Sequence, residues 1–196
     1  MPALLLGMAG AVSGLAAHAA EGARTDVLRI ALARAEVTFD PAQTDDISSG
    51  MVISAIFDAP LRYDAFARPE RLKPNTLVAL PEISSDFRRY TLRVRPGIFF
   101  ADDPAFGGQP RELTAADYAY ALKRHYDPRW RSPHLQTLES AGLLGLGALR
   151  QRALATGRAF DYDAEVEGLR ALDRYTLQLR FARPRPRFSF ELADAS

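Results

Sequence analysis

Apolar and charged residues alternate most clearly in two parts of the chain, residues 90–95 and residues 175–181. An alternation of period two is typical of a strand that buries one face, so both segments are predicted to be strands. A Pro-Gly pair at 96–97 predicts a turn, because proline fixes the first turn angle and glycine accepts a positive φ. We therefore expect residues 77–83, 90–95 and 98–100 to form an antiparallel meander.

The clearest helix signal begins at Thr114, with Asp117 at the capping-box position. This helix is predicted to stop at Asp127, because a proline follows. Lys123 and Arg124 are expected to lie outside its apolar stripe. The expected stripe consists of Tyr118, Ala121, Leu122 and His125.

Three further helices are predicted. The first covers residues 50–59, is capped by Ser48 or Ser49, and is expected to be buried because its apolar residues spread around most of its surface. The second covers residues 148–156 and ends at a glycine. The third covers residues 164–172, after acidic residues that suit a helix N-terminus.

Residues 27–32 read as another strand, and residues 61–64 as a short extended piece. Two stretches rich in turn-forming residues, 65–76 and 101–112, are expected to be loops. No internal repeat is visible in the sequence, and no linker separates two self-contained halves. The predicted fold class is therefore mixed α/β.

The composition is that of an ordinary globular protein, with 196 residues of which 47% are hydrophobic and 25% are charged. A net charge of +1 provides no bulk field for binding nucleic acid. The absence of cysteine excludes disulfides, thiolate metal sites, a cysteine nucleophile and a lipid-anchored N-terminal cysteine.

Residues 1–20 are predicted to be a signal peptide. Residues 3–17 carry no charge and are too short a run to span a bilayer comfortably, and Ala17-His18-Ala19 supplies a small-x-small cleavage pattern. No lysine or arginine precedes the apolar run, and the alternative is an ordinary buried helix. Export through this signal would place the protein in the periplasm.

No residue cluster in the sequence indicates a catalytic site or a metal site. The three histidines, His18, His125 and His134, are isolated and lack the spacing of a zinc hydrolase. The acidic pairs at 45–46 and 102–103 are expected to be solvent-exposed turn residues rather than acid–base catalysts. The acidic residues Asp161, Asp163, Glu165 and Glu167 lack the pattern of a calcium loop and are interpreted as a charged helix start.

A basic run near the end of the chain is interpreted as a solvent-exposed segment that follows a strand. A nucleic-acid site is not favoured, because the chain as a whole is nearly neutral. The run consists of Arg180, Arg183, Arg185 and Arg187.

Several motifs occur in an order that resembles the solute-binding proteins of peptide-type ABC importers, extracellular solute-binding protein family 5. A turn at 39–41 reads Phe-Asp-Pro where the family has a Leu-Asp-Pro-like turn. Residues 94–100 match Leu-Arg-Pro-Gly-x-x-Phe, residues 113–118 match Leu-Thr-Ala-x-Asp-Val, and residues 172–177 match Leu-Asp-x-Tyr-Thr-Val. The chain departs from the family at 59–60, where Ala-Pro replaces the usual glycine.

The resemblance implies a two-lobed, type II periplasmic-binding-protein-like fold, of which this chain is the N-terminal part. It implies the following division: residues 1–20 as signal peptide, 27–60 as the first segment of lobe I, 61–171 as an accessory meander and helical subdomain, and 172–196 as a truncated return to lobe I. Family members are considerably longer, so the opposite lobe is expected to lie beyond residue 196.

The resemblance further implies a monomeric, non-enzymatic receptor without a cofactor, which binds a peptide or similar solute between its lobes. It would deliver the solute to an ABC permease and its ATPase. The loop after the first strand, Glu36, Val37, Thr38 and Phe39, is the candidate ligand-binding segment; the alternative is that Phe39 is core and Glu36 solvated. A signalling or chaperone-like receptor of the same fold and a secreted hydrolase remain alternatives, and peptide, oligosaccharide, nickel and haem remain open as ligands.

Overall fold

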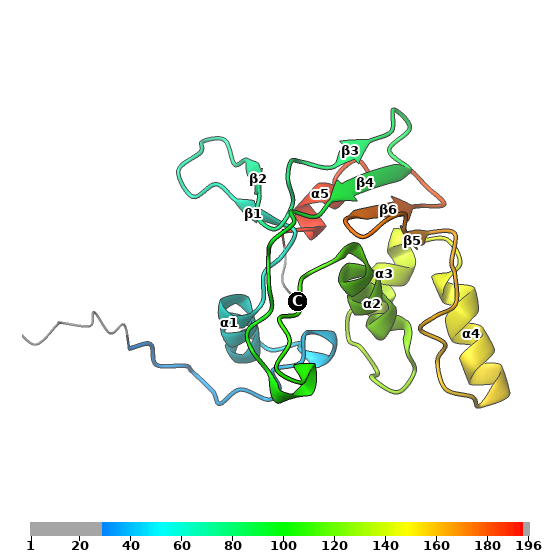
Figure 1. The fold of residues 1–196 in the computed structure, drawn as a ribbon, viewed down its shortest axis with the longest axis horizontal. Coiled ribbons are helices and arrows are strands. Elements are labelled where there is room, and N and C mark those ends of the chain that lie inside the picture. Colours follow the sequence, from blue (N-terminus) through cyan, green and yellow to red (C-terminus); the bar gives the residue numbers. More distant parts are fainter. Residues whose placement is uncertain (1–28, 194–196) are drawn as a thin grey trace, which may run out of the picture. The chain divides into compact units, whose positions relative to one another are not determined.

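The computed structural model describes residues 29–193. Its contacts divide the chain into one unit up to Ala31 and a second from Leu32 to Ser196, which holds every described helix and strand. The elements, labelled in Figure 1, are η1 (Pro41–Gln43), α1 (Ile47–Ile56), β1 (Leu61–Tyr63), β2 (Leu72–Pro74), β3 (Glu82–Ile83), β4 (Arg89–Arg93), η2 (Pro104–Phe106), α2 (Ala115–Tyr126), α3 (Leu135–Ala141), α4 (Leu146–Thr156), β5 (Leu169–Ala171), β6 (Thr176–Arg180) and α5 (Phe188–Glu191).

An antiparallel sheet with the order β3-β4-β6-β5 forms the centre of the second unit. Both strands with the strongest alternation are confirmed, and they pair with each other, Leu92 opposite Leu177. The predicted third strand of the meander, residues 98–100, is wrong: Phe99 forms only an isolated bridge with Glu112. The edge of β4 that residues 98–100 would use in a meander is occupied by β6, which lies much later in the chain.

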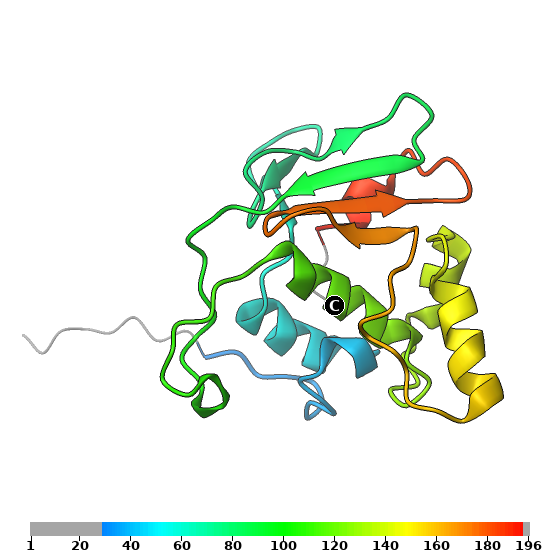
Figure 2. The same cartoon turned by 45° about the vertical axis from the view of Figure 1, so that its right-hand side comes forward.

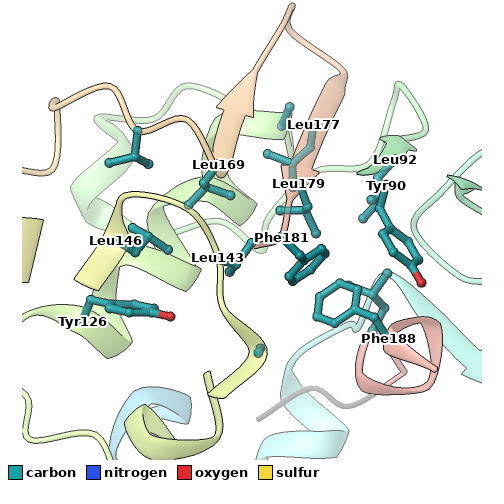
Figure 3. Packing of buried hydrophobic residues seen from close by; sticks show 14 of the residues in the cluster. Tyr90, Leu92, Tyr126, Leu143, Leu146, Leu169, Leu177, Leu179, Phe181 and Phe188 are labelled. Atoms are coloured by element: carbon teal, nitrogen blue, oxygen red, sulfur yellow. The ribbon is translucent and has the colours of Figure 1, made fainter. Parts of the chain in front are cut away.

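The alternating side chains of β4 and β6 place the hydrophobic core on one face of this sheet. Tyr90, Leu92, Leu177 and Leu179 are almost completely buried, while α2 packs against β5 and β6 and also against α3 and α4 (Figure 2). The aromatic rings of Tyr90, Phe181 and Phe188 meet one another at the end of this core (Figure 3).

The start of α2 confirms the predicted capping box. Asp117 Oδ2 accepts hydrogen bonds from the backbone N–H of Thr114 at 2.7 Å and from its hydroxyl at 2.8 Å. The expected stripe is partly wrong, because Ala121 is exposed and Lys123 is buried. Lys123 is tolerated there because its ammonium donates to the carbonyls of Tyr162 at 2.6 Å and Ala164 at 2.9 Å.

The predicted helix at 50–59 begins earlier and is less buried than expected. Asp46, not Ser48 or Ser49, is the N-cap, and its carboxylate accepts from the Ser49 N–H at 2.8 Å. Of the apolar side chains, Ile53 is fully buried, whereas Ile47 is 85% exposed and Ile56 is 60% exposed. Its apolar residues do surround the helix, but the described neighbours cover only one side.

Two other predicted elements are wrong. Residues 29–32 form no strand and have no strand partner among the described residues, and the other two residues of the predicted strand, 27 and 28, lie outside them. The predicted helix at 164–172 is instead an irregular stretch with a turn at 167–168, followed by β5, because pairing with β6 overrides a weak local helix signal.

The remaining differences are smaller. The predicted loop at 65–76 contains β2, which pairs with β1, and α3 is a helix that the sequence did not predict. The helix predicted at 148–156 is confirmed as α4 with Gly157 as its C-cap. Within residues 29–193, no helix is both long and apolar enough to cross a bilayer, and the predicted signal peptide lies outside that range.

Candidate ligand-binding segment

The predicted ligand-binding segment, Glu36–Phe39, is an irregular stretch that precedes η1. Glu36 is exposed, Val37 is 80% exposed and Phe39 is 50% exposed, while Thr38 is half-buried. The interpretation of Phe39 as a core residue is therefore wrong. The segment presents one acidic and two apolar side chains to its surroundings.

A single buried hydroxyl holds the backbone of this segment. Ser49 Oγ on α1 accepts from the N–H of Val37 at 2.9 Å and from the N–H of Thr38 at 3.3 Å, and Ser49 is completely buried. Both N–H groups are thus satisfied internally. In this arrangement the segment offers a ligand its side chains and carbonyls rather than these two donors.

The C-terminal end of the segment is tied to α2 by an ion pair. Asp40 receives both terminal nitrogens of Arg124, at 2.8 Å and 2.7 Å, and also caps η1 by accepting from the Ala42 N–H at 3.0 Å. The bond to Asp40 raises the pKa of Arg124. The Arg124 guanidinium also lies 4.6 Å from the centre of the Trp130 ring. A bidentate pair fixes orientation as well as distance, so the segment has a defined position.

Trp130 belongs to a second series of hydrogen-bonded side chains, which continues through Tyr162 to Asp127. Its Nε1–H donates to Tyr162 Oη at 3.1 Å, and that hydroxyl donates to Asp127 Oδ2 at 2.8 Å. Burial by itself would raise the pKa of Asp127, but hydrogen bonds from Arg129 and Tyr162 outweigh it and lower the pKa. The carboxylate therefore stays charged and holds the loop after α2.

The two described histidines lack a metal-site spacing in the sequence, and they lie next to each other in space. The rings of His125 and His134 lie 5.8 Å apart, edge to face. His125 Nδ1 pairs with Ser132 Oγ at 2.8 Å, and His134 Nε2 donates to the Thr44 carbonyl at 2.7 Å. Burial, followed by the nearby His134 and Arg124, lowers the pKa of His125 to about 4. Their joint role is to bind the loop after η1 to the loop after α2.

These contacts position a surface rather than assemble a reaction centre. Asp40 and Asp127 each face a guanidinium, and the acidic pairs weighed above supply Asp46 and Asp103 as helix caps. Within residues 29–193, no three His, Asp or Glu side chains gather as a metal site. The sequence did not indicate the Asp40–Arg124 pair, because the two residues are 84 positions apart.

A separate hollow of about 410 Å³ lies between the end of α1, β1 and α5. Its lining combines aromatic and polar side chains, including Phe57, Tyr63, Asn75 and Phe190, and none of residues 36–39 takes part. Sequence reasoning did not find this hollow, since its walls come from segments far apart in the chain.

Comparison with known proteins places the chain in a family. The model of the bacterial extracellular solute-binding proteins, family 5 Middle, matches residues 71–196. The chain belongs to this family. The resemblance seen in the sequence motifs is thereby confirmed. A search of the curated proteins gave no match.

Several solved structures contain a part with the same fold as this chain. The Escherichia coli murein tripeptide binding protein MppA is 25% identical, with a TM-score of 0.58 over 80% of this chain and 27% of its own. Haemophilus influenzae OppA, solved with the peptide RPPGFSPFR, is 22% identical with a TM-score of 0.59 over 80% of this chain and 27% of its own. Helicobacter pylori DppA, solved with the peptide STSA, is 20% identical with a TM-score of 0.57 over 79% and 27%.

The chain therefore spans about a quarter of the length of these structures. The mixed α/β fold class is confirmed. The chain corresponds to one part of the fold of these substrate-binding proteins.

Proposed function

We propose that this family 5 chain is part of the substrate-binding component of an ABC import system. In this role a peptide or similar solute is captured between two lobes without covalent chemistry. The observation that carries the proposal is the family match over residues 71–196. The peptide complexes of similar fold support peptide as the solute class.

We also propose that Glu36, Val37, Thr38 and Phe39 contact the solute. Glu36, Val37 and Phe39 are exposed, which leaves their side chains available, and the Asp40–Arg124 pair holds the segment in place without using them. A segment ordered before binding loses less conformational entropy on binding. Closure of the two lobes around the solute would then be driven by the difference in affinity between open and closed forms.

The same proposal assigns an extracytoplasmic location and a membrane partner. Residues 1–20 would direct export, and the loaded protein would dock on a permease whose ATPase powers import. The family is described as extracellular, which supports this location.

Uptake of a labelled peptide by cells tests the proposal. Deletion of the gene should abolish uptake, and the intact gene should restore it. Phe39→Ala should reduce uptake at limiting peptide, whereas Phe66→Ala, which removes a 94% exposed ring outside the segment, should not. Unchanged uptake with a lost transcriptional response to the peptide would indicate a signalling receptor, and turnover of the peptide by the purified protein would indicate a hydrolase.

A further inference from the structure

Two segments far apart in the sequence lie side by side at one end of the sheet. The β3–β4 turn, residues 84–88, runs along the connection from β6 to α5, residues 181–187 (Figures 1 and 2). The Arg185 N–H donates to the Phe87 carbonyl at 2.8 Å, and the Phe181 N–H donates to the Arg88 carbonyl at 2.9 Å. These bonds fix the two segments against each other.

Six arginines lie on these two segments and on the ends of β4 and β6 next to them. They are named here the arginine patch: Arg88, Arg89, Arg180, Arg183, Arg185 and Arg187. The acidic residues on the same segments or paired with the patch are Asp86, Glu167 and Glu191. Six positive and three negative charges leave +3 on the patch, although the whole chain carries only +1. The rest of the molecule is therefore net negative, and the patch is a local positive field.

Most of the patch is not neutralised within the described part of the chain. Arg180 pairs with Glu167 at 2.9 Å, and Arg185 pairs with Glu191. The other four arginines are exposed and form no ion pair with any of residues 29–193. Arg89 and Arg180 even stand directly opposite each other across β4 and β6, an arrangement of like charges that costs stability.

An aromatic residue sits in the middle of the patch in an unfavourable backbone conformation. Phe87 has a φ of 57°, a region where glycine, asparagine or aspartate is preferred and a bulky residue is uncommon. Its side chain is 42% exposed. The turn holds this conformation, since the Phe87 N–H donates to the Ser84 carbonyl at 2.9 Å, and the exposed ring remains available for contact.

We propose that the arginine patch with Phe87 binds the surface of an anionic phospholipid membrane. A surface with several unpaired arginines attracts anionic lipid headgroups, and an exposed phenylalanine ring beside them can enter the boundary between headgroups and acyl chains. The four unpaired arginines are exposed, so the patch suits an extended surface better than an enclosed small ligand. This inference rests on the proposed import role, in which the attraction would concentrate the chain near the membrane that holds its permease.

Sedimentation of the 196-residue chain with vesicles tests the proposal without any peptide. Binding is expected to vesicles of phosphatidylcholine mixed with phosphatidylglycerol and not to vesicles of phosphatidylcholine alone, and it should weaken as salt is raised. Arg88→Gln combined with Arg89→Gln should lower the partition constant roughly fivefold for each arginine removed. The matched control combines Arg152→Gln with Arg158→Gln, two exposed arginines on and just after α4, and should change binding little.

Phe87→Asn separates lipid binding from folding. Asparagine relieves the positive φ, so this variant should unfold at a higher urea concentration yet bind anionic vesicles more weakly. Equal binding to neutral and anionic vesicles, or an equal loss in the α4 control, would overturn the proposal. Tighter binding to polyglutamate than to anionic vesicles would assign the patch to an acidic protein partner instead.

Discussion

At the scale of single residues, Gly168 is the position where the backbone leaves no room for a side chain. A Cβ there would lie 2.9 Å from the Arg180 carbonyl oxygen and closer still to backbone atoms of Leu144. Three segments meet at this glycine through backbone hydrogen bonds, Gly168 N–H to Leu144 O at 2.8 Å and Arg180 N–H to Gly168 O at 3.0 Å. The collision involves backbone, which cannot move aside as a flexible side chain can.

Gly168→Ala is therefore expected to lower the free energy of unfolding by about 3 kcal/mol, measured by urea denaturation. Gly147→Ala is the matched control, because it lies in α4 with nothing within 4 Å of the new Cβ. Alanine in a helix is favoured over glycine by up to about 1 kcal/mol, so the control should be neutral or stabilising. Equal effects of the two substitutions would show that the three segments leave room for a methyl group at Gly168.

His125 makes a pH dependence testable at the same scale. Burial, His134 and Arg124 lower its pKa to about 4, below the ordinary value of 6.5. Between these two pH values His125 binds a proton in the unfolded chain but not in the folded chain. Stability should therefore fall as the pH drops from about 6.5 towards 4. His125→Gln should flatten the plot of urea midpoint against pH in this window, whereas above it the slopes of the two proteins should be the same. Parallel curves for both proteins would contradict the assignment.

At the scale of elements, α1 shows that a helix can have apolar residues all around it and still bury only one side. Ile53→Ala should cost about 2–4 kcal/mol, because Ile53 is fully buried. Ile47→Ala removes the same atoms from a side chain that is 85% exposed, and should change stability by less than about 0.5 kcal/mol. Chemical denaturation of both variants measures the contrast, and a large loss at Ile47 would mean that this face is covered in solution.

The elements that the sequence predicted well carry strong local signals. The β4 and β6 strands alternate, and α2 has a capping box at Thr114 and Asp117. The turn after β4 is confirmed by the φ of 80° at Gly97. By contrast, the stretch at 164–172 had acidic residues typical of a helix start, but its second half pairs with β6. That pairing is a tertiary contact, which local composition does not reveal.

At the scale of the whole molecule, the chain spans 27% of the length of the peptide-bound relatives. The proposed contact segment is one exposed strip, and a peptide held on one side only buries too little of its surface for tight binding. We expect titration calorimetry of the 196-residue chain with RPPGFSPFR to show no saturable binding in the micromolar range. Sub-micromolar, saturable binding would show that the described residues hold a complete site.

The amino-acid sequence by itself determined the mixed α/β class, the strands with alternating burial, the capped helix α2 and the family resemblance, because each depends on residues close together in the chain. The tertiary structure alone decided that β4 pairs with β6, that Lys123 is buried, that Asp40 meets Arg124 and that the Arg185 N–H donates to the Phe87 carbonyl. These features join segments tens of residues apart. Long-range pairing and packing select among local conformations that differ little in intrinsic free energy.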